Sequence, residues 1–201
     1  ARSVYVGGTP CQPACDSMSS RRSRYRARGM RLSSTRAAGS TLKLSTMPAT
    51  AVTAARAAYL AGFDATSNLE AASRYGIPAQ GTAAHAWTLL HVDDDSQPNE
   101  KAAFAAQIAR HGAGTTLLVD TFDITQGVIN AVEAAGTALG GVRIDSGDLG
   151  ALTRRVRKQL DELGASETKI VVSSDLDEFA IAGLRGDPVD VFGVGTSVVT
   201  G

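Results

Sequence analysis

Four short apolar runs recur between Thr115 and Gly201, and each of them ends abruptly in aspartate, serine, threonine or glycine. They read TTLLVDTFD, GVRIDSGDLG, KIVVSSDLDE and VDVFGVGTSVVTG. Buried strands that alternate with helices in this way are typical of a parallel sheet. Ligands bind at the carboxyl ends of such strands, because helix N-termini and unpaired backbone N–H groups converge there. The pattern therefore predicts an enzyme whose site lies at one edge of the sheet.

Regular secondary structure is predicted from residue 51 onward. The expected strands are a short one in GFDATSN, then 77–79, 115–120, 141–144, 169–173 and 189–194. The expected helices are 51–61, LEAASRYG, one opened by Gly81 and Thr82, NEKAAFAAQIARHG, 125–139, 149–163 and 177–185. Short connections between parallel strands imply right-handed βαβ units, and the equally polar strand ends favour a barrel over an open sheet. The predicted fold class is α/β, as an incomplete (β/α) barrel.

The length limits how much of a barrel the chain can form. Its 201 residues are fewer than the roughly 250 that a complete (β/α)8 barrel needs, so we expect a fragment or a chain that a partner closes. No apolar run approaches the roughly 18 residues of a membrane span, and the start lacks the pattern of a secretory signal. A soluble cytoplasmic protein is the expectation.

The charge is distributed unevenly between two kinds of sequence. Residues 1–50 hold nine Lys and Arg against one acid, which leaves eleven basic and nineteen acidic residues for 51–201. We therefore predict a disordered or aberrant Arg/Ser-rich segment at 1–50 and a barrel domain at 51–201. A basic arm for nucleic acid is the functional alternative, but its arginine cluster has no interleaved aromatic residue beyond Tyr25. Cys11 and Cys15 are too few for a zinc site or a disulfide framework.

Two strand ends carry residues suited to a phosphorylated sugar. In GVRIDSGDLG, Arg143 suits a phosphate, Asp145 suits ribose hydroxyls or Mg²⁺, and a glycine turn leads to Asp148. The FGVGTS run adds small residues whose N–H groups can cradle a phosphate, namely Gly193, Gly195 and Thr196. Each motif is common alone, but their repetition at consecutive strand ends predicts a shared site.

His85 is the histidine best placed for chemistry. It follows GTAA, so it lies just past a strand end on the predicted rim, unlike His91 and His111. It could serve as a base, a ligand or a phosphoryl acceptor, and the residues around it leave these three roles open.

Five segments together resemble one enzyme family. GTAAHAW, LLVDTFD, GVRIDSGDL, SSDLDE and FGVGTSVVTG, in this order and spacing, are similar to nicotinate phosphoribosyltransferases, and the match runs from about Thr53 to Gly201. The resemblance implies a type II phosphoribosyltransferase barrel. It also implies a homodimer that converts nicotinate and phosphoribosyl pyrophosphate into nicotinate mononucleotide and pyrophosphate, with Mg²⁺ and with coupled ATP hydrolysis through a phosphohistidine.

The resemblance also implies roles for single residues. His85 would be phosphorylated by ATP, while Arg143 and Asp145 would hold the phosphoribosyl donor, with Asp145 near ribose or metal. The expected frame of the 5′-phosphate is Ser174, Asp175, Gly193, Gly195 and Thr196, and Ser67 would lie near the pyridine ring. Thr66, Asp120 and Asp148 complete the predicted substrate-binding set. We expect Asp120, Arg143, Asp145, Asp175 and Gly195 to face one cavity mouth.

The chain also departs from the family pattern. Where family members carry a Gly-Ser-Arg-Arg-Thr-His-type motif, this chain reads STLKLSTMPATAV, so we expect its isolated activity to be absent or very low. Two other classes are weighed against this one. A different phosphate-binding barrel enzyme, such as quinolinate phosphoribosyltransferase or an aldolase-like protein, is the first, and a non-enzymatic nucleic-acid binder is the second. An aldolase needs a lysine at a strand end, and Lys169 lies at the opposite end.

Overall fold

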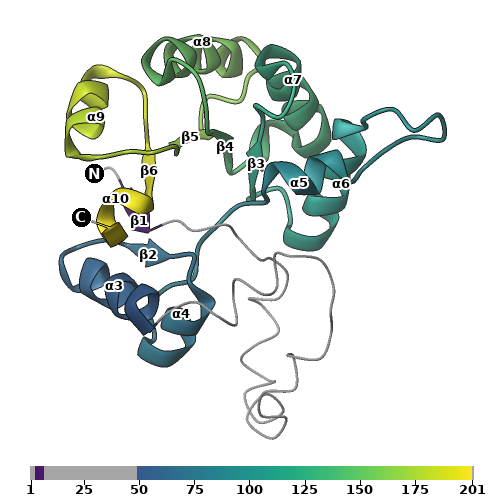
Figure 1. The fold of residues 1–201 in the computed structure, drawn as a ribbon. Coiled ribbons are helices and arrows are strands. Elements are labelled where there is room, and N and C mark those ends of the chain that lie inside the picture. The colour runs from purple at the N-terminus through teal and green to yellow at the C-terminus, as the bar shows by residue number, and fades with distance from the viewer. Residues whose placement is uncertain (1–2, 7–48, 201) are drawn as a thin grey trace, which may run out of the picture.

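The computed structural model describes residues 3–6 and 49–200 (Figure 1). The strands are β1 (Ser3–Val6), β2 (Ala65–Thr66), β3 (Thr116–Leu118), β4 (Gly141–Ile144), β5 (Lys169–Val172) and β6 (Val191–Val194). The α-helices are α3 (Ala49–Leu60), α4 (Leu69–Tyr75), α5 (His85–Leu89), α6 (Glu100–His111), α7 (Ile124–Ala135), α8 (Leu149–Glu162), α9 (Glu178–Gly183) and α10 (Thr196–Thr200). The 3-10 turns η2 (Gly136–Ala138) and η3 (Leu184–Gly186) follow α7 and α9.

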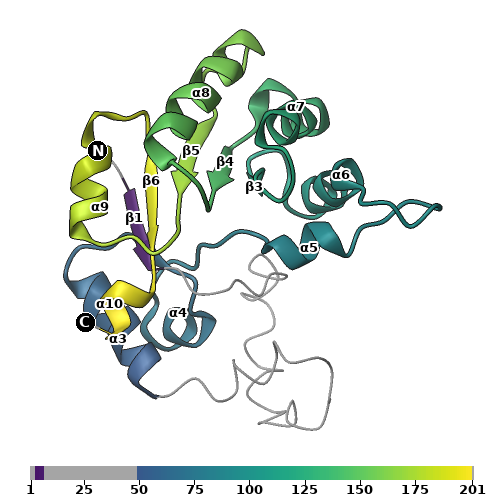
Figure 2. The same ribbon diagram turned by 45° about the horizontal axis from the view of Figure 1, so that its top comes forward.

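The strands form one parallel sheet with the order β2-β1-β6-β5-β4-β3. From β3 onward, strand and helix alternate, and α7, α8 and α9 connect consecutive neighbours of the sheet (Figures 1 and 2). Within the part of the chain that the structure describes, β2 and β3 end the order and do not pair with each other. This arrangement agrees with the predicted incomplete α/β barrel.

The main core lies between the sheet and the helices α6, α7 and α8. Its fully buried side chains include Phe104, Leu117, Val142, Val156 and Ile170. The strands read as continuous apolar runs because both of their faces are covered, as is usual in parallel sheets. Burial of one such side chain stabilises the fold by roughly 1.5–3 kcal/mol.

Polar side chains fix the starts of five helices, α4, α6, α7, α8 and α9. In each of these an Asn or Asp side chain at the N-cap accepts the backbone N–H three residues on; these residues are Asn68, Asn99, Asp123, Asp148 and Asp177. Each cap stabilises its helix by roughly 1 kcal/mol. The caps therefore hold the helix starts at the edge where the strands end.

Gly127 lets α7 lie unusually close to the chain leaving β3. A β-carbon placed on Gly127 would lie 2.3 Å from the carbonyl oxygen of Val119. Only glycine permits this approach. It holds the segment Asp120–Thr121, directly after β3, against a rigid helix.

Two predicted elements are wrong. Residues 77–79 form no strand; Ala79 only bridges Thr66. Gly81 and Thr82 do not open a helix either, because α5 begins at His85. The segment before α5 lacks helical hydrogen bonds, and the hydroxyl of Thr82 is instead a partner of Arg143 in β4.

The remaining predicted elements from residue 51 are confirmed, with ends that shift by a few residues. The strand predicted at 115–120 shortens to β3 because Val119 and Asp120 already turn toward the rim, and the strand predicted at 189–194 starts later, at Val191. In α3, Val52, Ala55 and Ala58 are buried, while Tyr59 and Leu60 are exposed.

Most of the basic segment lies outside the described residues, including Cys11, Cys15 and the arginine cluster. Within it, β1 lies between β2 and β6, a strand that no sequence periodicity predicted. In the described ranges no helix combines the length and the apolarity that a membrane crossing needs.

Candidate active site

The predicted site residues lie at the carboxyl ends of the strands. Asp120 follows β3, Asp145 follows β4, Ser174 follows β5 and Gly195 follows β6. All strands run parallel, so these positions share one edge of the sheet (Figure 2). His85, the first residue of α5, reaches the same edge from the segment that follows α4.

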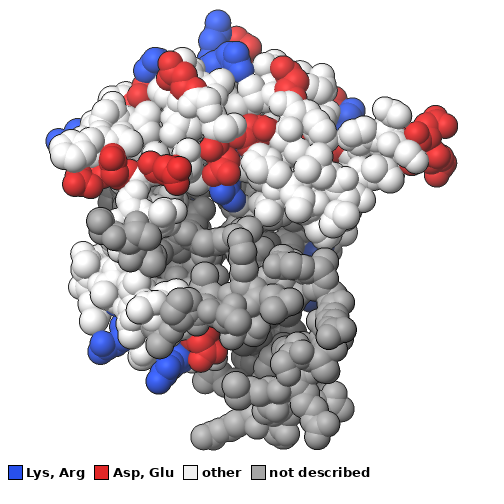
Figure 3. Space-filling model, viewed as in Figure 1, with Lys and Arg blue, Asp and Glu red and all other residues white. Residues whose placement is uncertain are grey.

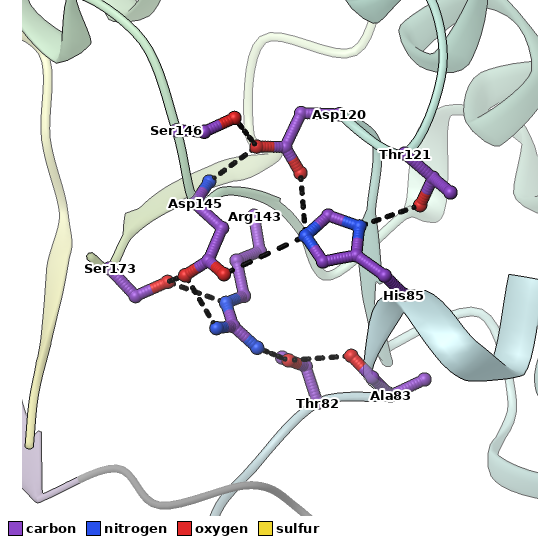
Figure 4. Close-up of polar contacts among 9 residues, drawn as sticks. All are labelled: Thr82, Ala83, His85, Asp120, Thr121, Arg143, Asp145, Ser146 and Ser173. Atoms are coloured by element: carbon purple, nitrogen blue, oxygen red, sulfur yellow. Dashed lines mark hydrogen bonds and ion pairs between the residues drawn. The ribbon is translucent and has the colours of Figure 1, made fainter.

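His85 lies between two carboxylates (Figure 4). Its Nε2 is 3.7 Å from Oδ2 of Asp145 and 4.0 Å from Oδ1 of Asp120. Its Nδ1 lies 3.1 Å from the hydroxyl of Thr121. Three contacts from two strand ends therefore orient the ring, whose side chain is still 39% exposed. The imidazole is held in place and yet accessible to a ligand.

Arg143 is held by three partners. Its Nε donates to Oγ of Ser173 at 2.6 Å, its NH1 to Oγ1 of Thr82 at 2.6 Å, and its NH2 to Oδ1 of Asp145 at 2.7 Å (Figure 4). Arg143 and Asp145 are two residues apart, so both side chains leave the same face of the chain. The guanidinium thus joins β4, the end of β5 and the segment before α5.

Asp120 ties β3 to the turn after β4. Its Oδ2 accepts the backbone N–H of Asp145 at 2.7 Å and the hydroxyl of Ser146 at 3.0 Å. Its Oδ1 is buried and has no hydrogen-bond donor among the described residues. Nε2 of His85 lies 4.0 Å from this oxygen and can supply a proton when the ring carries one there.

Asp145 is ionised despite its partial burial. Burial alone would raise the pKa of this carboxyl, but the hydrogen bond from Ser173, the charge and hydrogen bond of Arg143, and the charge of His85 outweigh it. The pKa of Asp145 therefore lies below its ordinary range, and the group is a carboxylate at neutral pH.

The other predicted site residues occupy different positions along the strand ends. The hydroxyl of Thr66 accepts the backbone N–H of Asn68, and Asp148 caps α8. Ser174 and Asp175 are exposed. Gly193 is buried within β6, and Ser67, Gly195 and Thr196 lie at the ends of β2 and β6. Of the five residues expected at one mouth, hydrogen bonds and ion pairs join Asp120, Arg143 and Asp145, while Asp175 and Gly195 share only the same edge.

Sequence reasoning missed Thr82, Thr121 and Ser173. Strand register could have indicated Ser173: Arg143 pairs with Val171, so position 173 neighbours Asp145 on the same face. The sequence reasoning chose Ser174, the next residue, which points elsewhere because the chain turns there with a φ of 139°. Nothing in the sequence indicates the contact between Thr82 and Arg143, which are 61 residues apart.

The cluster contains carboxylate oxygens that a metal ion could share with a bound substrate. Among the described residues, no three His, Cys, Asp or Glu side chains are placed to hold a metal ion by themselves. Magnesium is usually bound by one or two carboxylates together with substrate phosphates. Oδ2 of Asp145 and Oδ1 of Asp120 fit that shared kind of site, because the other oxygens of both residues are already hydrogen-bonded.

Known proteins match most of the chain. A family model described as the nicotinate phosphoribosyltransferase (NAPRTase) family matches residues 26–200. The chain is 65% identical over 153 residues to nicotinate phosphoribosyltransferase pncB1 of Mycobacterium tuberculosis, covering 75% of this chain and 34% of that protein. It is 42% identical over 154 residues to the nicotinate phosphoribosyltransferase of Bacillus subtilis, covering 73% and 30%. The chain thus spans about a third of the length of these curated relatives.

Solved structures support the same fold. A protein of Pyrococcus furiosus titled nicotinate-nucleotide pyrophosphorylase aligns with a TM-score of 0.70 and 26% identity, covering 99% of this chain and 43% of that one. The nicotinate phosphoribosyltransferase of Porphyromonas gingivalis aligns with a TM-score of 0.58 and 24% identity, covering 68% and 37%. At that identity, the second comparison bears on the fold alone.

The curated relatives favour the nicotinate enzymes over the alternative barrel enzymes. Lys169 opens β5, so it lies at the far end of that strand from the His85 cluster, and an aldolase mechanism has no lysine there. The matched region takes in His85, Arg143, Asp145 and all four polar strand ends. With the family model matching residues 26–200 and 153 residues of the chain 65% identical to a member, the chain belongs to the nicotinate phosphoribosyltransferase family.

Proposed function

We propose that this chain carries the phosphoribosyl-transfer centre of a nicotinate phosphoribosyltransferase. In the proposed reaction, nicotinate and phosphoribosyl pyrophosphate give nicotinate mononucleotide and pyrophosphate, coupled to hydrolysis of ATP to ADP and phosphate. The observation that carries the proposal is the placement of His85 between Asp120 and Asp145, beside the clamped guanidinium of Arg143.

The transfer step needs charge stabilisation more than a protein nucleophile. The bond from the ribose carbon to pyrophosphate breaks as the bond to the pyridine nitrogen forms, and positive charge develops on the sugar. Asp145, which is ionised, is suited to the ribose hydroxyls and to the developing positive charge. Arg143 has further N–H groups beyond the three that are already hydrogen-bonded. These suit the anionic oxygens of phosphoribosyl pyrophosphate.

Magnesium is proposed as the metal of this reaction, with Asp145 as its ligand and Asp120 as a second carboxylate beside it. When bound, Mg²⁺ would neutralise charge on the departing pyrophosphate. The fixed backbone of the turn after β4, which Asp120 holds, would keep both carboxylates at the donor.

The coupling to ATP is proposed to pass through His85. Two carboxylates near Nε2 favour the ring proton on that nitrogen, which leaves the lone pair on Nδ1, beside the hydroxyl of Thr121. Nδ1 would attack the γ-phosphorus of ATP as ADP leaves, and water would later break the phosphorus–nitrogen bond to release phosphate. Asp120 and Asp145 would balance the positive charge of the ring during the attack.

The test is phosphoryl transfer from ATP labelled at its γ-phosphate with ³²P. We expect acid-labile label on the wild-type chain and none on His85→Ala. His111→Ala, at the end of α6 and away from the cluster, is the matched control and should keep the label. Equal labelling of wild type and His85→Ala would remove His85 from the mechanism.

A parallel assay of nicotinate mononucleotide formation addresses substrate choice. The proposed pyridine substrate is nicotinate, and quinolinate should give no product.

The homodimer and the cytoplasmic location predicted from the sequence stay predictions. The size of the active species is measured by light scattering during the same experiments.

A further inference from the structure

The hydroxyl of Ser173 occupies the centre of the arginine–carboxylate pair. Ser173 follows β5 and is only 6% exposed. Its Oγ accepts Nε–H of Arg143 at 2.6 Å and donates to Oδ1 of Asp145. Its backbone N–H donates to the carbonyl of Ile144 at 3.0 Å. The ladder between β4 and β5 therefore holds the residue rigidly beside both charged groups.

The direction of both hydrogen bonds is fixed by chemistry. A guanidinium can only donate and a carboxylate can only accept, so the single hydroxyl proton must go to Asp145 while a lone pair receives Arg143. Together with the direct bond from NH2 of Arg143 to Oδ1 of Asp145, this closes a ring of three hydrogen bonds. The ring leaves Oδ2 of Asp145 directed at His85, 3.7 Å away.

We propose that Ser173 is a positioning residue that locks Arg143 and Asp145 together, so that one oxygen of Asp145 stays directed at His85 and the bound phosphoribosyl donor. For its effect on the reaction, this inference rests on the proposed function. Without the hydroxyl, the carboxylate of Asp145 is held by one direct bond and can rotate, and Nε of Arg143 loses its acceptor. If Ser173 only packed beside the site, Arg143 and Asp145 would both stay in place in Ser173→Ala.

The experiment compares the full chain with Ser173→Ala, Ser173→Thr and Ser166→Ala. Threonine keeps the hydroxyl and suits extended backbone. Ser166 is an exposed serine between α8 and β5 and serves as the matched control. The first measurement is the solvent-exchange rate of the Arg143 Nε proton by ¹H–¹⁵N NMR, assigned by its absence in Arg143→Lys. The second is kcat and KM for nicotinate mononucleotide formation, with each substrate varied.

We expect the Nε proton of Arg143 to exchange at least about tenfold faster in Ser173→Ala, and at the wild-type rate in Ser173→Thr and Ser166→Ala. Hydrogen bonds to charged groups are strong enough for kcat/KM of phosphoribosyl pyrophosphate to fall about 10- to 100-fold in Ser173→Ala. The KM of nicotinate should stay within about twofold, because Ser173 contacts only groups assigned to the donor.

Slow exchange retained in Ser173→Ala together with wild-type kcat/KM would overturn the inference. Fast exchange in Ser173→Thr equal to that in Ser173→Ala would also overturn it, since the hydroxyl would then not be the anchor. The NMR measurement needs no turnover. If the wild-type chain takes no ³²P label from ATP, the proposed function fails, while the exchange rates still decide the role of Ser173.

Discussion

At the scale of single residues, the candidate site consists of side chains whose partners leave them little freedom. Arg143 uses all three of its nitrogens on protein acceptors, and both nitrogens of His85 face oxygen atoms. The exception is Oδ1 of Asp120, which is buried without a donor among the described residues. An unsatisfied carboxylate oxygen is costly unless a cation approaches it, and the ring of His85 is the nearest group that can become one.

Asp120→Asn tests this pairing. The amide keeps an oxygen for the backbone N–H of Asp145 but removes the charge beside His85, so phosphorylation of His85 should slow by on the order of 10²-fold or more. The rate of ³²P labelling measures it. Asp161→Asn, an exposed position on α8, should label at the wild-type rate. Normal labelling of Asp120→Asn would mean that the carboxylate charge does not assist His85.

At the scale of secondary-structure elements, α6 and α7 are joined by a chain of polar side chains, of which Asn130 and Glu100 are buried. Gln126 donates to Asn130, and Asn130 donates to Oε2 of Glu100 at 2.9 Å. Burial raises the pKa of Glu100; the hydrogen bond from Asn130 opposes that shift, and the charge of Asp123 adds to it. The folded protein therefore binds a proton at Glu100 more tightly than the unfolded chain does.

Glu100→Gln should for that reason change how stability depends on pH. As pH rises through the ordinary glutamate range and the raised folded pKa, wild type loses stability, because the unfolded chain releases the proton first. The variant lacks this loss, so it should be the more stable protein at neutral pH, and the difference should vanish below the unfolded pKa. Urea unfolding at pH 3.5 to 8 measures both. A constant offset across that range would contradict the argument.

The contact of α7 with β3 gives a second prediction for an element. Gly127→Ala places a methyl group 2.3 Å from the carbonyl oxygen of Val119, and such overpacking costs about 1–3 kcal/mol. Gly183→Ala, in the helix α9 with no atom within 4 Å of the added carbon, should be neutral or slightly stabilising. The free energies of unfolding of both variants measure the difference. Equal stability would show that α7 can shift freely away from β3.

The sequence predicted the elements that depend on the order of apolar and polar residues within a single segment. The strands β4 and β5 and the position of His85 at the rim follow from apolar runs and strand-end position. The start of α5 was missed because nothing in the residues from Gly81 to Ala84 excludes a helix. Their path is determined by the contact of Thr82 with the distant Arg143. Ser173 and Thr121 were missed for the same reason, since their partners come from other strands and from α5.

At the scale of the whole molecule, ligand binding should stabilise several elements at once. The cluster draws on the segment before α5 and on the ends of β3, β4 and β5, so a donor bound there joins segments up to 91 residues apart in the chain, from Thr82 to Ser173. The described fold should therefore unfold less readily when phosphoribosyl pyrophosphate is present.

At a concentration 100 times its Kd, phosphoribosyl pyrophosphate should raise the free energy of unfolding by about 2.7 kcal/mol. Thermal melts over a ligand series measure the change, and ribose 5-phosphate, which lacks pyrophosphate, should stabilise less at equal concentration. A melting temperature independent of phosphoribosyl pyrophosphate would argue against a donor site in this chain.

The hydrogen bond between Arg143 and Thr82 links the guanidinium group to the segment that carries His85. An anion that draws the guanidinium toward itself should weaken the hydrogen bond to Thr82. The segment that carries His85 should then become more mobile. By thermodynamic reciprocity, a displacement of the segment that carries His85 should in turn change the affinity of Arg143 for an anion. We therefore expect a ligand bound at His85 and an anion bound at Arg143 to influence each other's affinity through this 2.6 Å contact.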